Sequence, residues 1–249
     1  PLSINAQDIS NQGILSAAAT GLSDFILHKG ADVDRIFGIS GINPELLLSP
    51  TLSLQLTNYC EVLEQSAKLS HCDNFGLHYG QQFHPKALGL IGYIGLCSAS
   101  LEDALKNMTS HFNLHQKDTL CRMVEVNDAY RFDYQVQHGA ILSRRQDAEL
   151  TVGMFMNVIR EVLGTHYSPR EIHFEHPRPE FWQEHSKLFN ASVFFDQPFN
   201  SILIAKSDLK TAMPQSDPLL LTMMLDTLKI LNTQSQCKRP LNTPSEFIL

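Results

Sequence analysis

Histidines are the residues of this 249-residue sequence best suited to acid–base or metal chemistry, and two pairs among the eleven have suggestive spacing. His111 and His115 are four residues apart, so they would share a face if a helix extends that far. His173 and His176 are three apart, and on a strand such residues point to opposite faces unless the chain turns at Pro177. Neither pair has the additional ligands of a zinc or haem site. A metal- or haem-binding protein, or a small enzyme using these histidines, is therefore the alternative interpretation.

Nucleophile and cofactor motifs are incomplete. Cys97-Ser98 follows a glycine-rich stretch but lacks the G-x-S-x-G context of a hydrolase. Gly89, Gly92 and Gly95 form G-x-x-G-x-x-G, without the lysine or ribose-binding acid of a nucleotide site. We interpret these glycines as sites of close packing, and we expect no catalytic residue, no cofactor and no metal.

Charged residues within apolar segments are a second kind of candidate. Arg122 lies on the same strand face as Leu120 and Val124. It could hold the carboxylate of a ligand through two hydrogen bonds, or it could extend to water from an edge position. Glu149 and Arg160 lie on or near a long amphipathic helix.

The composition limits the class of protein. The net charge is −7, and the basic pairs are Arg144-Arg145 and Lys238-Arg239, so these residues do not form a DNA-binding surface. The five scattered cysteines are typical of a reducing cytoplasm. No apolar run reaches the ~18 residues of a membrane span, so we expect a cytoplasmic protein without a membrane partner.

The N-terminal elements are predicted to be helical. Apolar spacing favours a helix from about Ile14 to Ile26, ended by Gly30, and another over residues 52–69. Ser100 and Asp103 form a capping signal for a later helix.

A β-hairpin is predicted next. The runs TLCRMVEV and YRFDYQVQ flank Asn127-Asp128-Ala129. In the second run Tyr130, Phe132, Tyr134 and Val136 alternate with polar residues, which indicates an aromatic inner face.

The remaining sequence alternates helices and strands. A helix is predicted from about Asp147 to Gly164, then a strand at REIHFEH, a short helix through Trp182, and strands at ASVFF and NSILIA. Asp217 and Pro218 open a last helix to about Leu231. The order predicts an α+β fold, with N-terminal helices, then a mostly antiparallel sheet with inserted helices, then a closing helix. We expect one domain over 1–232, helical to about 115 and β-rich over 116–232, followed by a linker over 233–249.

Several motifs resemble one family. The segment FGLHYGQQFHPKALGLIGYIGLCSASLEDALKNM matches FGL-x-x-G…LG-x-x-GY…S-x-(S/T)-L-x-x-AL. In the same order follow QDAELTVGMFMNVIREVLG, SPREIHFEHPRP, FNASVFFDQPFNSILIAKSDL and MPQSDPLL. Over about residues 13–232 the chain resembles the N-terminal, arabinose-binding-like effector domain of AraC/XylS-type bacterial transcription regulators, in the subgroup that includes ornithine- and arginine-responsive activators.

The resemblance implies a small-molecule effector, a homodimer, and DNA contact only through a C-terminal helix-turn-helix domain that this sequence does not include. We expect the effector between the N-terminal helices and the aromatic face of the hairpin. The predicted lining is Tyr93, Arg122, Phe132, Tyr134 and Phe174.

The closing helix is the predicted dimer contact. One stripe consists of Leu219, Leu220, Met223, Met224, Thr227, Leu228 and Leu231, and the residues off this stripe are Leu221, Leu225 and Ile230. One side of the helix would face its own domain and the other a second copy. Apolar residues therefore cover more of this helix than one core contact requires. We place Leu221 and Leu225 in the dimer interface, although burial of the whole helix within its own domain is an equal alternative.

Overall fold

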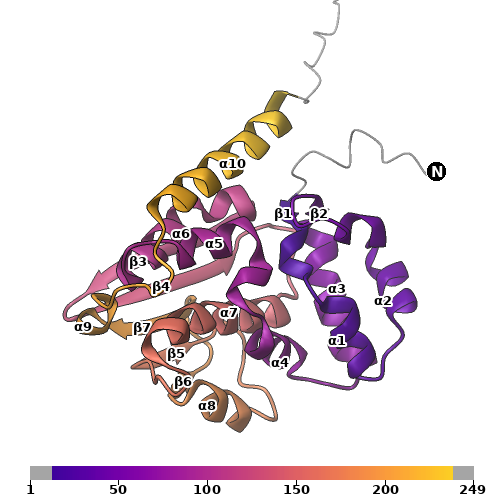
Figure 1. Cartoon of the computed structure of the whole chain (residues 1–249). Coiled ribbons are helices and arrows are strands. Elements are labelled where there is room, and N and C mark those ends of the chain that lie inside the picture. Colours follow the sequence, from indigo (N-terminus) through magenta and orange to yellow (C-terminus); the bar gives the residue numbers. More distant parts are fainter. Residues whose placement is uncertain (1–12, 238–249) are drawn as a thin grey trace, which may run out of the picture.

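Helix α7 (Arg145–Leu163) is the central element of the computed structural model, which describes residues 13–237 (Figure 1). Among the apolar residues that predicted this helix, Val152, Phe155 and Ile159 are fully buried. One side of α7 contacts α3 and α4, and another side contacts the sheet. The predicted helix from Asp147 to Gly164 is confirmed.

Helices and short turns fill the first part of the chain. The helices are α1 (Leu22–His28), α2 (Val33–Ser40), α3 (Leu56–Leu69), α4 (Phe75–Gln82), α5 (Leu90–Leu96) and α6 (Leu101–His115). Short 3₁₀ turns occupy Ser16–Ala19, Pro44–Leu47 and Pro85–Leu88. The predicted helix from Ile14 to Ile26 is wrong in its first half. Strand β1 (Gly13–Leu15) instead pairs antiparallel with β2 (Ser53–Gln55).

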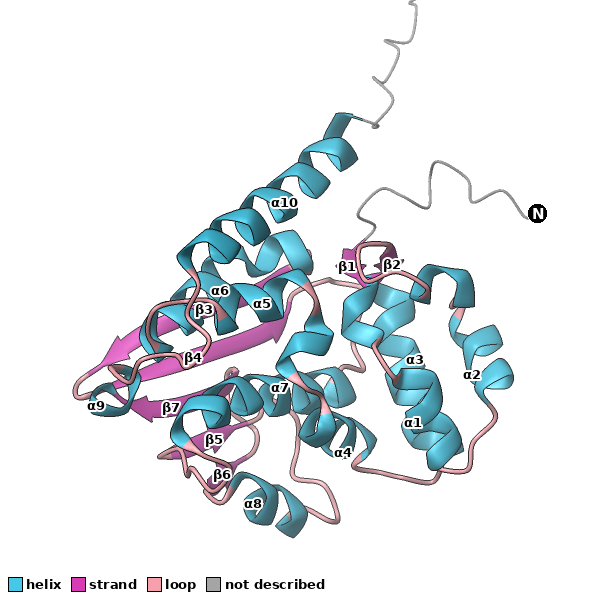
Figure 2. Cartoon of the chain, in the orientation of Figure 1, coloured by secondary structure: helices cyan, strands magenta, loops and turns pink. Residues whose placement is uncertain are grey.

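A five-stranded sheet forms most of the second part (Figure 2). Its strands are β3 (Thr119–Val126), β4 (Ala129–Val136), β5 (Glu171–His173), β6 (Ser192–Phe194) and β7 (Asn200–Ala205), in the spatial order β3-β4-β7-β5-β6. The β5–β6 pair is parallel and the other pairs are antiparallel. The hairpin, the later strands and the α+β class are confirmed.

The register places one apolar row across all five strands. Met123 pairs with Phe132, Phe132 with Ile202, Ile202 with Ile172, and Ile172 with Val193. Helices cover this face, since the ring of Phe132 lies 4.1 Å from that of Phe155 in α7 and Tyr134 contacts Phe112 in α6. The buried residues of both parts form one continuous core.

Three glycines allow α4 and α7 to approach closely. A Cβ at Gly76 would lie 2.1 Å from the carbonyl oxygen of Gln146, and one at Gly80 would lie 2.8 Å from that of Leu150. A Cβ at Gly153 would lie 3.1 Å from the backbone of Gly80. Side chains at these positions would push the two helices apart, so the glycines determine how closely α7 packs against α4.

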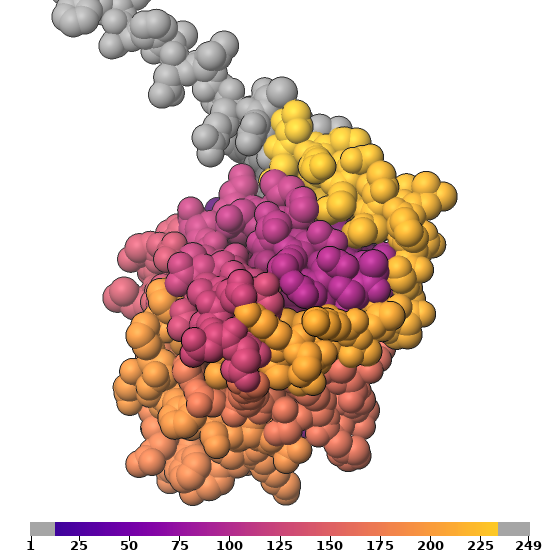
Figure 3. Space-filling model, turned by 90° about the vertical axis from the view of Figure 1, so that its left-hand side faces the viewer, coloured from indigo at the N-terminus to yellow at the C-terminus, as the bar shows by residue number. Residues whose placement is uncertain are grey.

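The remaining helices within residues 13–237 are α8 (Gln183–Phe189), α9 (Lys206–Leu209) and α10 (Pro218–Cys237). Asp217 caps α10 by accepting a 2.9 Å hydrogen bond from the Leu220 amide. Helix α10 lies on the outside, against α5 and α6 (Figure 3). It continues to Cys237, beyond the predicted end near Leu231, so residues 233–237 of the expected linker are helical, and the rest of that linker lies outside the described residues. No helix within residues 13–237 has the length and apolar character of a membrane span.

Candidate functional site

A cavity lined mainly by charged side chains opens at the N-terminus of α7. Its volume is about 340 Å³. We call it the polar cavity, and it is lined by Glu64, Leu142, Ser143, Arg144, Arg145, Glu175, His176 and Pro177. Helix α3 supplies Glu64, and the segment before α7 supplies residues 142–144. Glu175–Pro177 follow β5. Segments that are distant in the sequence therefore meet here.

Both arginines of the polar cavity already hold carboxylates. Arg144 binds both oxygens of Glu175, with Nε–Oε1 and Nη2–Oε2 distances of 2.7 and 3.1 Å. Arg145 binds Glu149 at 2.9 Å and Asp73 at 3.0 Å. Bidentate and charge-assisted pairs of this kind are strong. A ligand anion would therefore have to displace a carboxylate of the protein.

Glu64 and Asp147 form no such pair. Within the described residues, no lysine, arginine or histidine forms an ion pair with either side chain. Glu64 accepts a 3.0 Å hydrogen bond from the Gln146 amide, and Asp147 accepts one of 2.7 Å from the hydroxyl of Tyr134. The second carboxylate oxygen of Asp147 is buried without a hydrogen-bond partner in the described part of the chain.

Burial changes the acidity of both carboxyl groups. It raises the pKa of Asp147 from 3.8 to about 7, and the nearby charges of Glu64 and Glu175 act in the same direction. Burial also raises the pKa of Glu64. Such displaced values in or beside a cavity are typical of functional sites. Near neutral pH, Asp147 is therefore poised between its protonated and ionised forms.

A second buried network lies behind the cavity. The Oε1 atom of Glu149 is 2.7 Å from Nε2 of His185 and 3.2 Å from Nε2 of His176, in addition to its bond with Arg145. Burial opposes the ionisation of Glu149, but the two histidines and Arg145 outweigh it and hold the pKa well below its usual range. Helix α8, which carries His185, is thereby attached to α7.

The five residues predicted to line the effector site do not share a cavity. Phe132, Tyr134 and Phe174 are fully buried. Helices α6 and α7 fill the space that we expected between the N-terminal helices and the aromatic face. Tyr93 lines a separate groove of about 550 Å³ beside Thr20 and Lys86.

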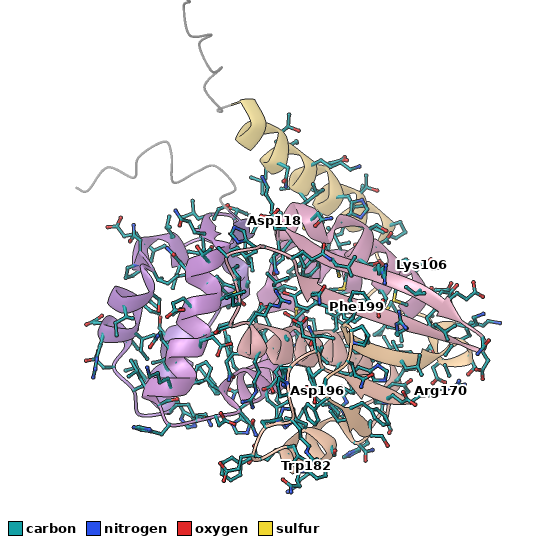
Figure 4. The ribbon with its side chains drawn as sticks, turned by 180° about the vertical axis from the view of Figure 1, so that it is seen from behind. Lys106, Asp118, Arg170, Trp182, Asp196 and Phe199 are labelled. Carbon is teal, nitrogen blue, oxygen red and sulfur yellow. The ribbon has the colours of Figure 1, made fainter. Side chains whose placement is uncertain are left out.

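Arg122 lies on the opposite face of the sheet. It pairs across the strands with Asp133, whose side chain faces away from Phe132 and Tyr134. Its Nε is 3.0 Å from the fully buried carboxylate of Asp133, and its guanidinium lies 5.0 Å from the ring centroid of Phe199, labelled in Figure 4. The arginine therefore binds a carboxylate of its own chain while its side chain is 44% exposed. Of the five predicted residues, Tyr134 donates its hydrogen bond to Asp147, and the ring centroid of Phe174 lies 5.0 Å from that of His176, which lines the cavity.

The four candidate histidines also separate. His173 binds Glu171 at 2.8 Å, whereas His176 joins the Glu149 network. His111 contacts the carbonyl oxygen of Asn107. Burial lowers the pKa of His115 to about 3, so its ring is neutral at physiological pH. Among residues 13–237, no group of three or more histidine, cysteine or acidic side chains could hold a metal ion.

The motifs near Cys97 have structural roles. Ser98 donates a 2.7 Å hydrogen bond to the carbonyl oxygen of Ile94, and Cys97 is buried. A Cβ at Gly92 would lie 1.9 Å from the carbonyl oxygen of Pro85, and one at Gly95 would lie 2.5 Å from the sulfur of Met108. The interpretation of these glycines as close-packing sites is confirmed.

Sequence reasoning missed Glu64, Asp147, Glu175 and His185 as members of one site. One signal was present, because Arg145 and Glu149 continue the i, i+3, i+4 spacing of the apolar stripe of α7 toward its N-terminus. Charges at buried-stripe positions indicate an internal ion pair. No local pattern indicated the partners from α3 and α8.

The comparisons with known proteins support a ligand-binding regulatory domain and give its family. Residues 30–213 match the family model described as the arabinose-binding domain of AraC transcription regulators, N-terminal. This match covers most of the chain, and the chain belongs to that family.

Two relatives are similar over most of this chain. The ornithine utilization regulator of Pseudomonas aeruginosa is 20% identical over 213 residues, which are 81% of this chain and 60% of that regulator. The crystal structure of the transcriptional regulator CdpR from Pseudomonas aeruginosa matches with a TM-score of 0.58 at 15% identity, covering 85% of this chain and 66% of CdpR. The chain thus spans less than two thirds of the length of each.

Proposed function

We propose that the chain is the effector-sensing part of a cytoplasmic AraC-type transcription regulator, and that the polar cavity is its effector site. The observation that carries the proposal is a cavity, in a family of regulatory domains, that is lined by Glu64 and lies close to the buried Asp147, two carboxyl groups whose pKa values are raised by burial. The charged residues that line the larger groove beside Tyr93, Asp24 and Lys86, are both exposed.

The position of the polar cavity suits a sensor. It lies where α3, α7 and the segment after β5 meet, and the Glu149 network extends from it to α8. A ligand bound there would favour one arrangement of these elements, by no more than its difference in affinity between the two arrangements. Such a change would alter the disposition of a DNA-binding helix-turn-helix part, which lies outside residues 1–249. We assign no enzyme activity to the chain.

We also propose that α10 carries a homodimer contact, but on a different face from the one predicted. Leu221 and Leu225 are half-buried and contact the domain's own core. Leu219, Met223 and Ile230 are 73%, 54% and 56% exposed and recur at i, i+4 and i+11, on one helix face. We call these three residues the outer face of α10, and a second copy packed across a two-fold axis would cover them.

Occlusion of the polar cavity tests the proposed function. Ser143 is an exposed lining residue, so Ser143→Trp would fill the cavity without removing a core contact. A library of sugars, amino acids, amines and fatty acids would be screened by the rise in melting temperature that binding produces. We expect at least one compound to stabilise the wild type and not the Ser143→Trp variant.

Leu48→Trp, at a position that is 81% exposed and remote from the cavity, is the matched control. A ligand that stabilises Ser143→Trp as well as it stabilises the wild type would contradict the assignment.

A further inference from the structure

We propose that Cys72 is a site of covalent modification, whose thiol adds to an α,β-unsaturated carbonyl compound with His78 as the proton acceptor. Cys72 lies in the turn between α3 and α4, His78 lies in α4, and Glu184 lies in α8. We call these three residues the thiol cluster. The inference does not depend on the polar cavity being the effector site.

The contacts of His78 determine which ring nitrogen carries the hydrogen. Nε2 of His78 lies 2.8 Å from Oε2 of Glu184, and Nδ1 lies 3.5 Å from Sγ of Cys72. The Lys29 ammonium, which can only donate, lies 3.4 Å from the same Nδ1 atom. Because the carboxylate can only accept, Nε2 carries the hydrogen and Nδ1 presents its lone pair to the thiol.

The carboxylate that orients His78 is itself held in place. The side chain of Asn74 donates a 3.0 Å hydrogen bond to Oε2 of Glu184. This bond and the contact with His78 lower the pKa of Glu184, so the carboxyl group is ionised at neutral pH. A nucleophile, a base within hydrogen-bond reach and a third group that orients the base together form the arrangement that activates weak nucleophiles.

The acidity of the thiol makes the base necessary. Burial raises the pKa of Cys72, and the charges of Glu184 and Asp73 act in the same direction, whereas Lys29 and the Asn74 amide lower it by less. The resting group is therefore a thiol. His78 can take its proton as the sulfur attacks, which is the role of a general base. Glu184 favours the imidazolium that forms, and Lys29 opposes it while favouring negative charge on the sulfur.

Access and partners distinguish Cys72 from the other described cysteines. Cys60 and Cys97 are buried, whereas Cys72 and Cys121 are partly exposed, and all four are free thiols. Among the cysteines that the structure describes, Cys72 is the one with a histidine nitrogen within hydrogen-bond distance of its sulfur. Exposure together with a neighbouring base is typical of reactive cysteines, whereas buried cysteines are inert.

The proposed reaction needs no oxidant. The sulfur of Cys72 forms a bond to the β-carbon of the electrophile, the carbon–carbon π bond breaks, and its electrons move toward the carbonyl oxygen as an enolate. The thiol proton passes to Nδ1 of His78 and from there to the α-carbon, so the ring ends in its starting state. The Lys29 ammonium, beside the same ring atom, favours the enolate. The thiol is consumed once, so the reaction is a modification without turnover.

An adduct on Cys72 would lie close to the polar cavity. The next residue along the chain, Asp73, accepts a 3.0 Å hydrogen bond from Arg145, which lines the cavity, and Asn74 also binds Arg145. Modification would therefore displace residues that position one wall of the cavity.

The experiment uses N-ethylmaleimide, an α,β-unsaturated carbonyl compound, on the chain of residues 1–249. Quenched reactions analysed by peptide mass spectrometry give the rate of adduct formation at each cysteine. At pH 7 we expect native Cys72 to react at least about tenfold faster than the same thiol in the urea-unfolded chain, because general-base assistance is worth about 10²- to 10⁴-fold and burial offsets part of it. His78→Gln should remove this advantage.

The pH dependence separates base assistance from a structural role of His78. In His78→Gln the rate should rise about tenfold per pH unit below the pKa of the thiol, because the thiolate alone then reacts. In the wild type the rise should be less steep, since His78 accepts the proton. Glu184→Gln should give an intermediate rate. Cys121→Ser, at the other partly exposed cysteine, is the matched control that should leave the rate at Cys72 unchanged.

Circular dichroism would show that each variant is folded. A first adduct on another cysteine, a native rate no higher than that of the unfolded chain, or a His78→Gln variant with the rate and pH dependence of the wild type would each overturn the inference. If His78→Gln does not fold, Glu184→Gln decides, because an unchanged rate in that variant would equally contradict the thiol cluster.

Discussion

Replacement of Asp147 by asparagine should stabilise the protein, and by an amount that grows with pH. The side chain is 1% exposed, and its pKa in the folded state is about 7, compared with an ordinary aspartate pKa of 3.8. Between these values the folded state holds a proton that the unfolded state has released. Stability therefore falls as pH rises from about 4 to about 7, and the loss is complete above that range.

The magnitude follows from the pKa difference. About three pKa units correspond to about 4 kcal/mol, at about 1.4 kcal/mol for each unit. Asparagine has nearly the same shape, and its carbonyl oxygen can still accept the hydrogen bond from Tyr134. It cannot ionise, so Asp147→Asn avoids this loss. Any pH-independent cost of replacing the carboxyl group by an amide cancels when the stabilities at two pH values are compared. The difference in free energy of unfolding between Asp147→Asn and the wild type should therefore increase by about 3 kcal/mol from pH 5 to pH 8.

Urea denaturation followed by far-ultraviolet circular dichroism would measure the free energy of unfolding at pH 5, 6, 7 and 8. Wild type, Asp147→Asn and the exposed control Asp34→Asn would be compared. The reasoning would be refuted by a stability difference between wild type and Asp147→Asn that is constant over this range, or that changes in the opposite direction. The control should show no trend of comparable size.

Three further predictions concern packing, the buried network and assembly. Gly76→Ala should cost several kcal/mol of stability or prevent folding, because the added methyl group meets the α7 backbone. Gly38→Ala has open space around the added methyl group and should stabilise α2 by about 0.5–1 kcal/mol. Urea denaturation measures the free energy of unfolding of both variants. Glu149→Ala should lower the free energy of unfolding by about 3–5 kcal/mol, because the Arg145 guanidinium and the buried His185 ring lose the carboxylate that they bind. A cost below about 1 kcal/mol would contradict the network. Met223→Glu, on the outer face of α10, should give a folded monomer by light scattering. Leu221→Glu, which changes a residue packed against the core, should instead reduce stability. A wild type that is itself monomeric at tens of micromolar would exclude this interface.

Local signals predicted the elements whose structure depends on neighbouring residues. Alternation with period two located the hairpin, and the apolar stripe located α7. The capping signal at Ser100 is confirmed by the 3.1 Å bond from the Asp103 amide. The error at Gly13–Leu15 has a non-local cause, because that strand exists only through its pairing with Ser53–Gln55. A short apolar segment does not indicate on its own whether such a partner exists.

The α10 residues illustrate the same limit. Periodicity showed that apolar side chains cover more than one side of the helix, which is correct. It did not determine which side faces the domain, because Leu221 and Met223 are equally apolar in the sequence. The contact of α10 with α5 and α6 decides that, and it leaves Met223 exposed.

The sequence by itself therefore determined the α+β class, the order of helices and strands, the family and the acidic character of the chain. Only the tertiary structure decided where a ligand could bind. The close approach of α4 and α7 at their glycines, and the packing of α3 beside them, bring Glu64 to Asp147, 83 positions further along the chain. A carboxyl group acquires its altered pKa from burial and from the charges around it, and both come from residues distant in the sequence.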